Sequence, residues 1–380
     1  MGDSLEEMLA RDWRFGGRIN VASVKRMDST GAKTPRLEDY GLLRRLGVVA
    51  LVQATVRGSD IEVTVHNTVR ETVERTARFR LGQPMNSAAW RMQVHAMSDQ
   101  LELWISGVKG IAATRILFVA EGKLWQVDSD GANAIVLADT ERAMSPVWSP
   151  RGDRVAYVTL GPSGSRIVIR EASGESRALE TPPGGLNITP AFTPDGTTLL
   201  YAHGGETGVD LFATMLGGTR ATRRLTVGRG SDNTQPSLNA DGRRVAFTTN
   251  RTGHPEVFVS DADGTNAELF TDYFEENAYR ANPDWSPDGR LIAFEARIAG
   301  QLQIVTMGLR DRLPKRHTNE GANEQPAWAP DSRHLVFTST RGGTKQLWVL
   351  DTETGEARQL TYAQGGARFG AWSRSLEDSP

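Results

Sequence analysis

The sequence contains no cysteine and no excess of basic residues. Its 44 Lys and Arg are balanced by 46 Asp and Glu, which gives a formal net charge of −2 over 380 residues. The lack of cysteine excludes disulfides, thiolate metal sites and cysteine nucleophiles. The lack of a basic excess removes the electrostatic attraction that supports nucleic-acid binding, so we expect no nucleic-acid partner.

Long apolar runs are also missing. The most apolar stretch, residues 46–56 (LGVVALVQATV), has about half of the ~20 residues that a membrane-spanning helix needs. The first residues, MGDSLEEMLARDW, lack the basic start and apolar stretch of a secretory signal. We therefore expect a protein that does not span a membrane, and the sequence as given shows no export signal.

What the sequence does contain is a repeated phrase. Five complete copies read PVWSPRGDRVAYV, PAFTPDGTTLLYA, PSLNADGRRVAFT, PDWSPDGRLIAFE and PAWAPDSRHLVFT, beginning at Pro146, Pro190, Pro236, Pro283 and Pro326. A sixth, GAWSRS from Gly370, stops after its first strand. The aligned positions 148, 192, 238, 285, 328 and 372 are 44, 46, 47, 43 and 44 residues apart, a period that holds about four short strands.

Each copy has the pattern of a hairpin followed by two further strands. Ser286, Pro287 and Gly289 occupy positions i, i+1 and i+3 of a type I turn, where Pro presets φ and Ser bonds the backbone. An alternating strand such as 244–247 follows, then a third such as 256–259, an Asp- and Gly-rich turn, and a short fourth strand. Four antiparallel strands predict one blade of a β-propeller.

The two ends of the repeat array complement each other. Residues 115–138 contain the second, third and fourth strands of a blade, and residues 369–373 form a first strand with nothing after it. Pairing them closes the ring and removes the unpaired edges of an open array. The sequence therefore predicts a six-bladed all-β propeller of four-stranded blades, and closure leads us to expect a monomer.

The first 110 residues predict a small α/β domain. We expect helices at 4–13, 37–46 and 86–106, a short strand at 18–24, and three strands at 48–56, 61–69 and 72–81. Helices covering one face of a small sheet are the simplest assembly. The Gly-rich segment 106–114 is the joint, so the predicted domains are residues 1–110 and 111–380.

At this point the sequence resembles the TolB family of the bacterial Tol-Pal envelope system, whose members join a small α/β domain to a six-bladed propeller. The joint 107–116 (GVKGIAATRI) carries the resemblance most specifically, and the match covers nearly the whole chain. The resemblance implies a periplasmic, non-catalytic, protein-binding function with a Pal-like lipoprotein as partner, in outer-membrane integrity and cell division. It also implies TolA and other Tol proteins as partners. This chain lacks the signal peptide and the flexible N-terminal stretch by which relatives contact TolA, so binding of TolA is an open expectation.

The candidate binding residues lie in the connectors from the fourth strand of one blade to the first strand of the next. These connectors share one face around the central channel and are rich in polar side chains, which could alternatively serve only to cap turns. Family resemblance places Pal at this channel mouth, with Leu186, Thr189 and Thr234 as the best candidates. The full predicted set is Met144, Ser145, Leu186, Asn187, Thr189, Asn233, Thr234, Gln235, Arg280, Asn282, Asn323 and Glu324.

The sequence shows no motif typical of a metal site or of a catalytic nucleophile. The Asp/Gly turns at 128–131 and 261–264 lack the further carboxylates of a calcium loop, and the six histidines have no metal-ligand spacing. Residues 161–165 fail the GxSxG nucleophile pattern. We therefore predict no catalytic residues, no metal and no cofactor. The alternatives are a TolB-like propeller with a different client and the propeller part of a peptidase-like enzyme.

Overall fold

A computed structural model of the chain describes residues 2–22, 40–140, 142–162, 164–205, 208–217, 222–228, 230–271 and 279–374. By its internal contacts the chain divides into two compact units, Met1–Ala113 and Thr114–Pro380.

The N-terminal unit contains helices and one antiparallel sheet. Within the described residues of this unit the helices are α1 (Gly2–Gly16), α3 (Tyr40–Arg45) and α4 (Ala88–Ser106). The sheet has the order β1-β2-β3, with strands Ala50–Arg57, Asp60–Asn67 and Thr72–Arg80. The sequence sets the limits of α4: the Ser87 side chain accepts a hydrogen bond from the Trp90 N–H at 3.1 Å, and Gly107 ends the helix in the left-handed conformation.

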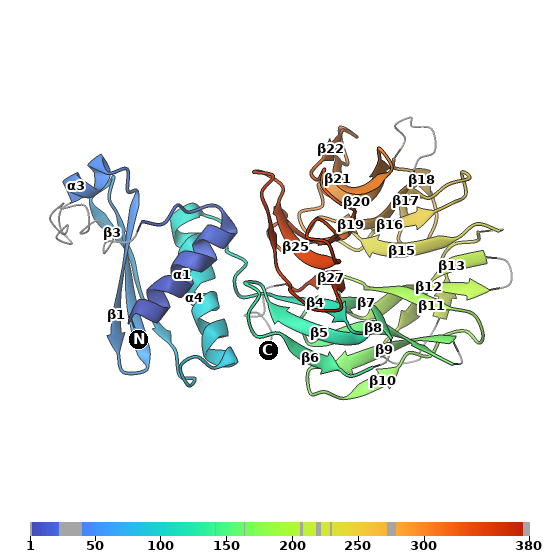
Figure 1. The fold of residues 1–380 in the computed structure, drawn as a ribbon, viewed down its shortest axis with the longest axis horizontal. Helices are drawn as coiled ribbons and strands as arrows, with labels where there is room; N and C mark the ends of the chain where they lie inside the picture. The colour runs from blue at the N-terminus through green and yellow to red at the C-terminus, as the bar shows by residue number, and fades with distance from the viewer. Residues whose placement is uncertain are drawn as a thin grey trace. The chain divides into compact units, whose positions relative to one another are not determined.

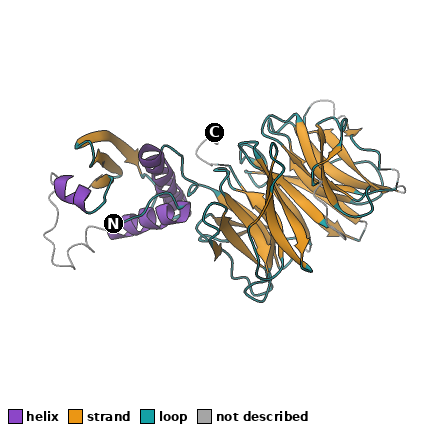
Figure 2. Cartoon of the chain, turned by 90° about the horizontal axis from the view of Figure 1, so that it is seen from above, coloured by secondary structure: helices purple, strands orange, loops and turns teal. Residues whose placement is uncertain are grey.

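The core of this unit lies between the two long helices and one face of the sheet, as Figure 2 shows. Its buried residues are Leu5, Met8, Leu9, Trp13, Ile61, Val63, Val65, Leu81, Trp90, Val94, Met97 and Leu101. The expected strand at 18–24 is wrong for residues 18–22, which have no strand structure; residues 23 and 24 lie outside the described residues. Apolar and polar residues alternate around Ile19 and Val21 because these two side chains pack on the core, although neither residue belongs to a strand of the sheet.

The second unit consists of six four-stranded antiparallel sheets. Figure 1 shows the fourth strands β10, β18 and β22 at the rim and inner strands such as β7, β15 and β19 toward the centre. The first three sheets comprise β7 (Ala143–Trp148), β8 (Arg154–Gly161), β9 (Gly164–Glu171) and β10 (Ser176–Ala178); β11 (Asn187–Phe192), β12 (Thr198–Gly205), β13 (Gly208–Met215) and β14 (Thr222–Arg224); and β15 (Asn233–Leu238), β16 (Arg244–Thr249), β17 (Glu256–Asp261) and β18 (Glu268–Leu269). The next two comprise β19 (Arg280–Trp285), β20 (Leu291–Ile298), β21 (Gln301–Gly308) and β22 (Pro314–Arg316); and β23 (Asn323–Trp328), β24 (His334–Ser339), β25 (Gln346–Asp351) and β26 (Ala357–Gln359).

Each blade buries both faces of its sheet against its neighbours. On β20, Phe294 packs in a cluster with Val259 of the preceding blade, whereas the adjacent Ala293 packs in a cluster with Phe337 of the following blade. Successive side chains of a strand point to opposite faces, so the central residues of the second strands, such as 292–294 on β20, are consecutively apolar. The hydrophobic core of the propeller therefore lies in the seams between blades.

The closing blade combines the two ends of the propeller sequence, as predicted. It has the order β27-β4-β5-β6, from β27 (Ala367–Trp372), β4 (Arg115–Ala120), β5 (Lys123–Asp128) and β6 (Ile135–Ala138). The Ser373 N–H donates to the Arg115 carbonyl at 2.8 Å, and Trp372 Nε1–H donates to Thr114 Oγ1 at 2.8 Å. The six-bladed ring is thus closed by hydrogen bonds between segments about 260 residues apart in sequence.

Candidate functional site

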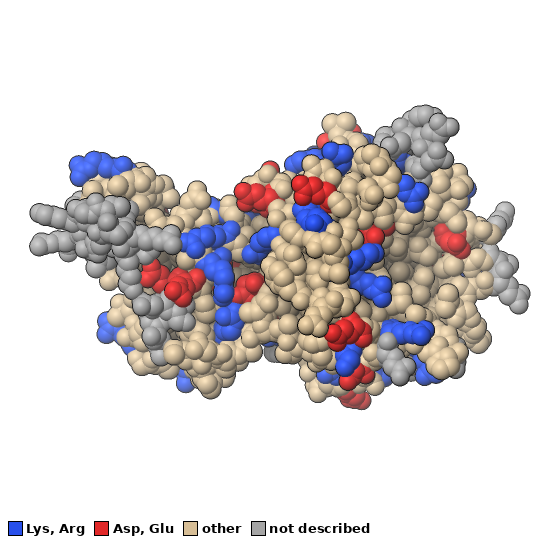
Figure 3. Space-filling view, in the orientation of Figure 1, with Lys and Arg blue, Asp and Glu red and all other residues tan. Residues whose placement is uncertain are grey.

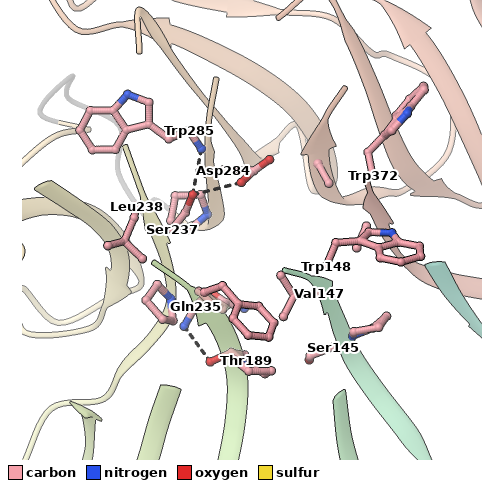
Figure 4. A pocket seen from close by; sticks show the side chains of 18 of the residues that line it. Ser145, Val147, Trp148, Thr189, Gln235, Ser237, Leu238, Asp284, Trp285 and Trp372 are labelled. Carbon is pink, nitrogen blue, oxygen red and sulfur yellow. Dashed lines mark hydrogen bonds between the residues drawn. The ribbon is translucent and has the colours of Figure 1, made fainter. Parts of the chain in front are cut away.

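The inner strands of the six blades surround a cavity of about 510 Å³, which we call the channel. Its lining runs along the inner strands, from the residues before the repeat prolines, such as Ser145 (Figure 4), to the tight turns, such as Pro150. We call the end near the fourth-to-first-strand connectors the channel mouth. The only charged residues of the described lining are Asp284 and Arg374.

Every inner strand carries a β-bulge at the same position. The pairing register shifts there in all six first strands, for example between Met144 and Val147. The residue before the repeat proline, or before Gly370 in the sixth copy, has a left-handed φ between 46° and 59°. Non-glycine residues rarely adopt this conformation, and such strain often marks functional positions. These six residues, which we call the bulge ring, are Ser145, Thr189, Gln235, Asn282, Gln325 and Phe369.

Hydrogen bonds join members of the bulge ring across the seams. The Gln235 N–H donates to Thr189 Oγ1 at 3.1 Å (Figure 4). The Asn282 N–H donates to Gln235 Oε1 at 3.1 Å and to Thr248 Oγ1, on the second strand of the preceding blade, at 3.2 Å. A strained backbone N–H in one blade is thus satisfied by side chains of the blade before it.

The same pattern continues at the next two seams. The Gln325 N–H donates to Glu295 Oε2 at 2.8 Å, and the Phe369 N–H donates to Gln325 Oε1 at 3.2 Å. Burial raises the pKa of the Glu295 carboxyl. Tyr279 donates its hydroxyl to Glu295 Oε1 at 3.3 Å, and burial, with the nearby Glu295 charge, raises the pKa of Tyr279 to about 12. Tyr279 therefore stays a neutral donor at physiological pH.

Asp284 ties three consecutive blades together at the channel wall. Its Oδ1 accepts from Ser237 Oγ of the preceding blade at 3.0 Å, and its Oδ2 accepts from the Trp328 N–H of the following blade at 2.8 Å. Ser237 Oγ also accepts from the Trp285 N–H at 3.0 Å, so it bridges the carboxylate and the backbone (Figure 4). Burial raises the pKa of the Asp284 carboxyl to about 6, and these hydrogen bonds offset only part of that rise.

The twelve residues predicted from the sequence fall into three groups. Five line the channel: Met144, Ser145, Thr189, Gln235 and Asn282. Four of these belong to the bulge ring, and Thr189 and Gln235 use their side chains to bond the next blade.

Four others begin inner strands and are at most 5% exposed, namely Asn187, Asn233, Arg280 and Asn323. Three bond the third strand of the preceding blade: Asn233 Nδ2 to Asp210 Oδ1 at 3.1 Å, Arg280 Nη1 to Glu256 Oε1 at 2.6 Å, and Asn323 Nδ2 to Gln303 Oε1 at 3.0 Å. Asn187 Oδ1 bonds His203 Nδ1 at 2.9 Å. The structure therefore gives all four side chains internal contacts: three join neighbouring blades, whereas the Asn187–His203 contact lies within one blade.

The remaining three lie at the mouth outside the channel lining. Leu186 is 50% exposed, and Thr234 is partly exposed. Glu324 Oε2 accepts from Lys345 Nζ at 2.7 Å. Leu186 is therefore a large apolar side chain held in solvent beside polar neighbours that are themselves buried.

The prediction missed Gln325, Phe369, Ser237 and Asp284. Gln325 precedes a repeat proline as Gln235 does, so alignment of the copies contained the signal for it. The alignment gave no signal for Asp284, because the equivalent residue is Ser237 in one other blade and apolar in the rest. Only the fold shows that this position faces the channel.

The lining offers neutral hydrogen-bonding groups and apolar surface. The described lining includes the side chains of Ser145, Thr189, Gln235, Asn282 and Gln325 together with prolines and aromatic residues. On the propeller face drawn in Figure 3, basic and acidic side chains are interspersed. None of the helices in the described ranges has the length and apolarity to cross a membrane. Such a channel suits recognition of a neutral or mixed polar surface.

These features define a six-bladed propeller of four-stranded blades, closed by its own ends around a channel and preceded by a small α/β unit. The chain belongs to the TolB beta propeller domain family (PD40), whose profile matches residues 104–376.

Two relatives and one solved structure show what the chain is similar to. It is 26% identical over 257 residues to the Tol-Pal system protein TolB of Bordetella pertussis, covering 66% of this chain and 56% of that protein. It is 27% identical over 272 residues to TolB of Bordetella parapertussis, covering 70% of this chain and 61% of that protein. The chain thus spans little more than half the length of these relatives. The crystal structure of TolB from Acinetobacter baumannii superposes with a TM-score of 0.82 at 19% identity, covering 97% of this chain and 93% of that one.

Proposed function

We propose that this protein is a non-catalytic, protein-binding scaffold of the Tol-Pal system that works in the periplasm. It binds a Pal-like peptidoglycan-associated lipoprotein through the channel mouth and thereby supports outer-membrane integrity and envelope constriction at cell division. Family membership over residues 104–376 and relatives named as Tol-Pal system proteins support this assignment. The domain of residues 1–110 is the candidate contact for TolA or other Tol proteins.

The exposure of Leu186 is the observation that supports placing the contact at the mouth. Four polar side chains at the starts of the inner strands are buried, yet Leu186, on a connector at the same mouth, is 50% exposed. Large apolar side chains in solvent beside a polar rim are typical of interface centres. The partly exposed Thr234 and the channel-lining Thr189 flank the same opening.

Calorimetry with a Pal-like lipoprotein domain from the same genome tests the proposal. Thr234→Trp places a large side chain where the partner must approach closely, so we expect affinity to fall about a hundredfold or more. Leu186→Asp should weaken binding about tenfold or more, because it removes apolar area and adds a charge that binding must desolvate.

Arg290→Trp is the matched control. Arg290 follows the tight turn of the fourth repeat copy, at the opposite end of the inner strands, and its side chain is 84% exposed. We expect this variant to bind like the wild type. If Arg290→Trp abolished binding while Thr234→Trp did not, with both variants folded, the wrong face has been assigned. Turnover of oligopeptide or ester substrates that one point substitution removes would defeat the scaffold assignment.

A further inference from the structure

The bulge ring is not bonded in the same way at all six seams. Each ring N–H is placed to face two side chains of the preceding blade. One is the preceding ring residue, as Gln235 is for Asn282, and the other lies on the preceding second strand, as Thr248 does for Asn282 and Glu295 for Gln325. At four seams an oxygen at one or both of these positions accepts from the ring N–H.

At two neighbouring seams these positions are almost entirely apolar. The N–H of Ser145 faces the seam where the two corresponding residues are Phe369 and Val119. Val119 is equivalent to Thr248 because each pairs with the residue just before the bulge of its blade. The N–H of Thr189 faces the seam where the corresponding residues are Ser145 and Val158. Among these residues only Ser145 carries an oxygen, and within the described part of the chain its hydroxyl has no hydrogen-bond partner.

The strand ladder does not use these two N–H groups either. The Arg142 carbonyl accepts from the Leu160 N–H at 3.2 Å, and the Leu186 carbonyl accepts from the Gly204 N–H at 2.7 Å. Antiparallel ladder bonds recur at every second residue, so residues 144 and 188 are the next ladder-bonded positions. The N–H groups of Ser145 and Thr189 therefore point away from their own sheets, and both residues line the channel.

We propose that the N–H groups of Ser145 and Thr189, with the Ser145 hydroxyl, bind acceptor oxygens inside the channel, one at each of the two seams. The oxygens belong to carboxylate or backbone carbonyl groups that a partner inserts from the mouth. They take the places that the Gln235, Thr248 and Glu295 oxygens hold at the other seams. The site rests on the proposed function only for the identity of the partner.

Amide resonances of the ¹⁵N-labelled full-length protein test the site directly. Sodium acetate and N-methylacetamide serve as the carboxylate and carbonyl probes, with sodium chloride at matched ionic strength as the blank. We expect at least one probe to shift the amide signals of Ser145 and Thr189 about threefold more than those of Gln235 and Asn282, whose N–H groups are already bonded. A response to acetate alone indicates a carboxylate ligand, and a response to both indicates any carbonyl oxygen.

An isosteric pair of substitutions closes the site. Val119→Thr with Val158→Thr supplies hydroxyl oxygens where Thr248 has one and should abolish the selective shifts. Val245→Thr is the control, because it also buries a hydroxyl in a second strand but lies away from the ring. The proposal is overturned if Ser145 and Thr189 respond no more than Gln235 and Asn282, or if the double variant responds like the wild type.

The same variants separate this site from the proposed function. If the lipoprotein domain binds through the site, the double variant should weaken its affinity about tenfold, while Val245→Thr leaves it within about twofold. Selective probe shifts without any lipoprotein binding to the wild type would refute the proposed partner and retain the site. If the double variant bound the lipoprotein domain as strongly as the wild type, and the wild type showed no probe shifts, the site would be refuted and the proposed partner retained.

Discussion

The two units of this chain build their cores in opposite ways. Among the described residues of the N-terminal unit, α1, α4 and the sheet pack together in one hydrophobic cluster. The propeller distributes its buried residues over separate clusters, each formed by neighbouring blades. Every blade therefore depends on two neighbours, and the ring depends on its closing strand. A small change should act locally in the first unit, whereas loss of one strand should act on the whole of the second.

Removing β27 should have the largest effect. Truncation after residue 366 deprives β4 of its partner strand and removes Trp372 from its hydrogen bond with Thr114. We expect the propeller to melt about 10 °C lower or more, as a single transition, because opening one seam exposes the edges of the closed ring. Differential scanning calorimetry measures this.

Deletion of residues 2–16 is the matched truncation in the other unit. It removes α1 and so exposes the N-terminal core, but the propeller transition should stay within about 2 °C of its original temperature. Loss of both transitions together in either truncation would show that the two units do not unfold independently.

Substitution of a single buried cation between two blades should have the next largest effect on stability. Arg280→Met leaves Glu256 buried without its ion pair to Arg280 Nη1, which costs about 3–5 kcal/mol of unfolding free energy. Arg280→Met combined with Glu256→Gln should recover most of that loss, because no buried charge is then left uncompensated. Urea unfolding followed by tryptophan fluorescence compares the three proteins. If the single and the double variant were equally stable, the loss of stability would not come from the uncompensated charge of Glu256.

The smallest effect should come from titration of Asp284. Its carboxyl has a pKa of 3.8 in the reference state and about 6 in the folded protein, so the folded state binds more protons between these values. Stability should therefore fall as pH rises from about 4 to about 6, by about 1–3 kcal/mol, and then level off. Asp284→Asn should remove this decline.

The measurement is the difference in unfolding free energy between wild type and Asp284→Asn at several pH values. The difference cancels carboxylates that act with the opposite sign, such as Asp351, whose pKa the Arg333 guanidinium helps to lower to about 2. A difference that does not change between pH 4 and pH 7 would contradict the assignment of a raised pKa to Asp284.

The repeat explains why so much of the propeller could be predicted. The repeated phrase recurs every 43 to 47 residues, so strand order, blade number and closure followed from one alignment. The N-terminal unit has no internal copy to check against, and there the alternation around Ile19 and Val21 was wrongly interpreted as a strand.

The site was less predictable because polar residue type does not reveal direction. Asn187 and Asn282 both precede the tight turn of a repeat copy and are both amides, yet one is buried against His203 and the other lines the channel. The bulge shifts the register by one residue and so decides which side chain faces inward. Nothing in the composition of the connectors encodes that shift.

The shared closing blade also bears on where the chain enters the ring. The Ser373 N–H and the Arg115 carbonyl are 2.8 Å apart, so a short peptide could join the two ends of the propeller. A gene permuted in this way, with its new termini in the exposed connector at 183–186, would encode the same six blades in a different order. Closure of the ring therefore does not depend on where along the ring the N-terminal unit is attached.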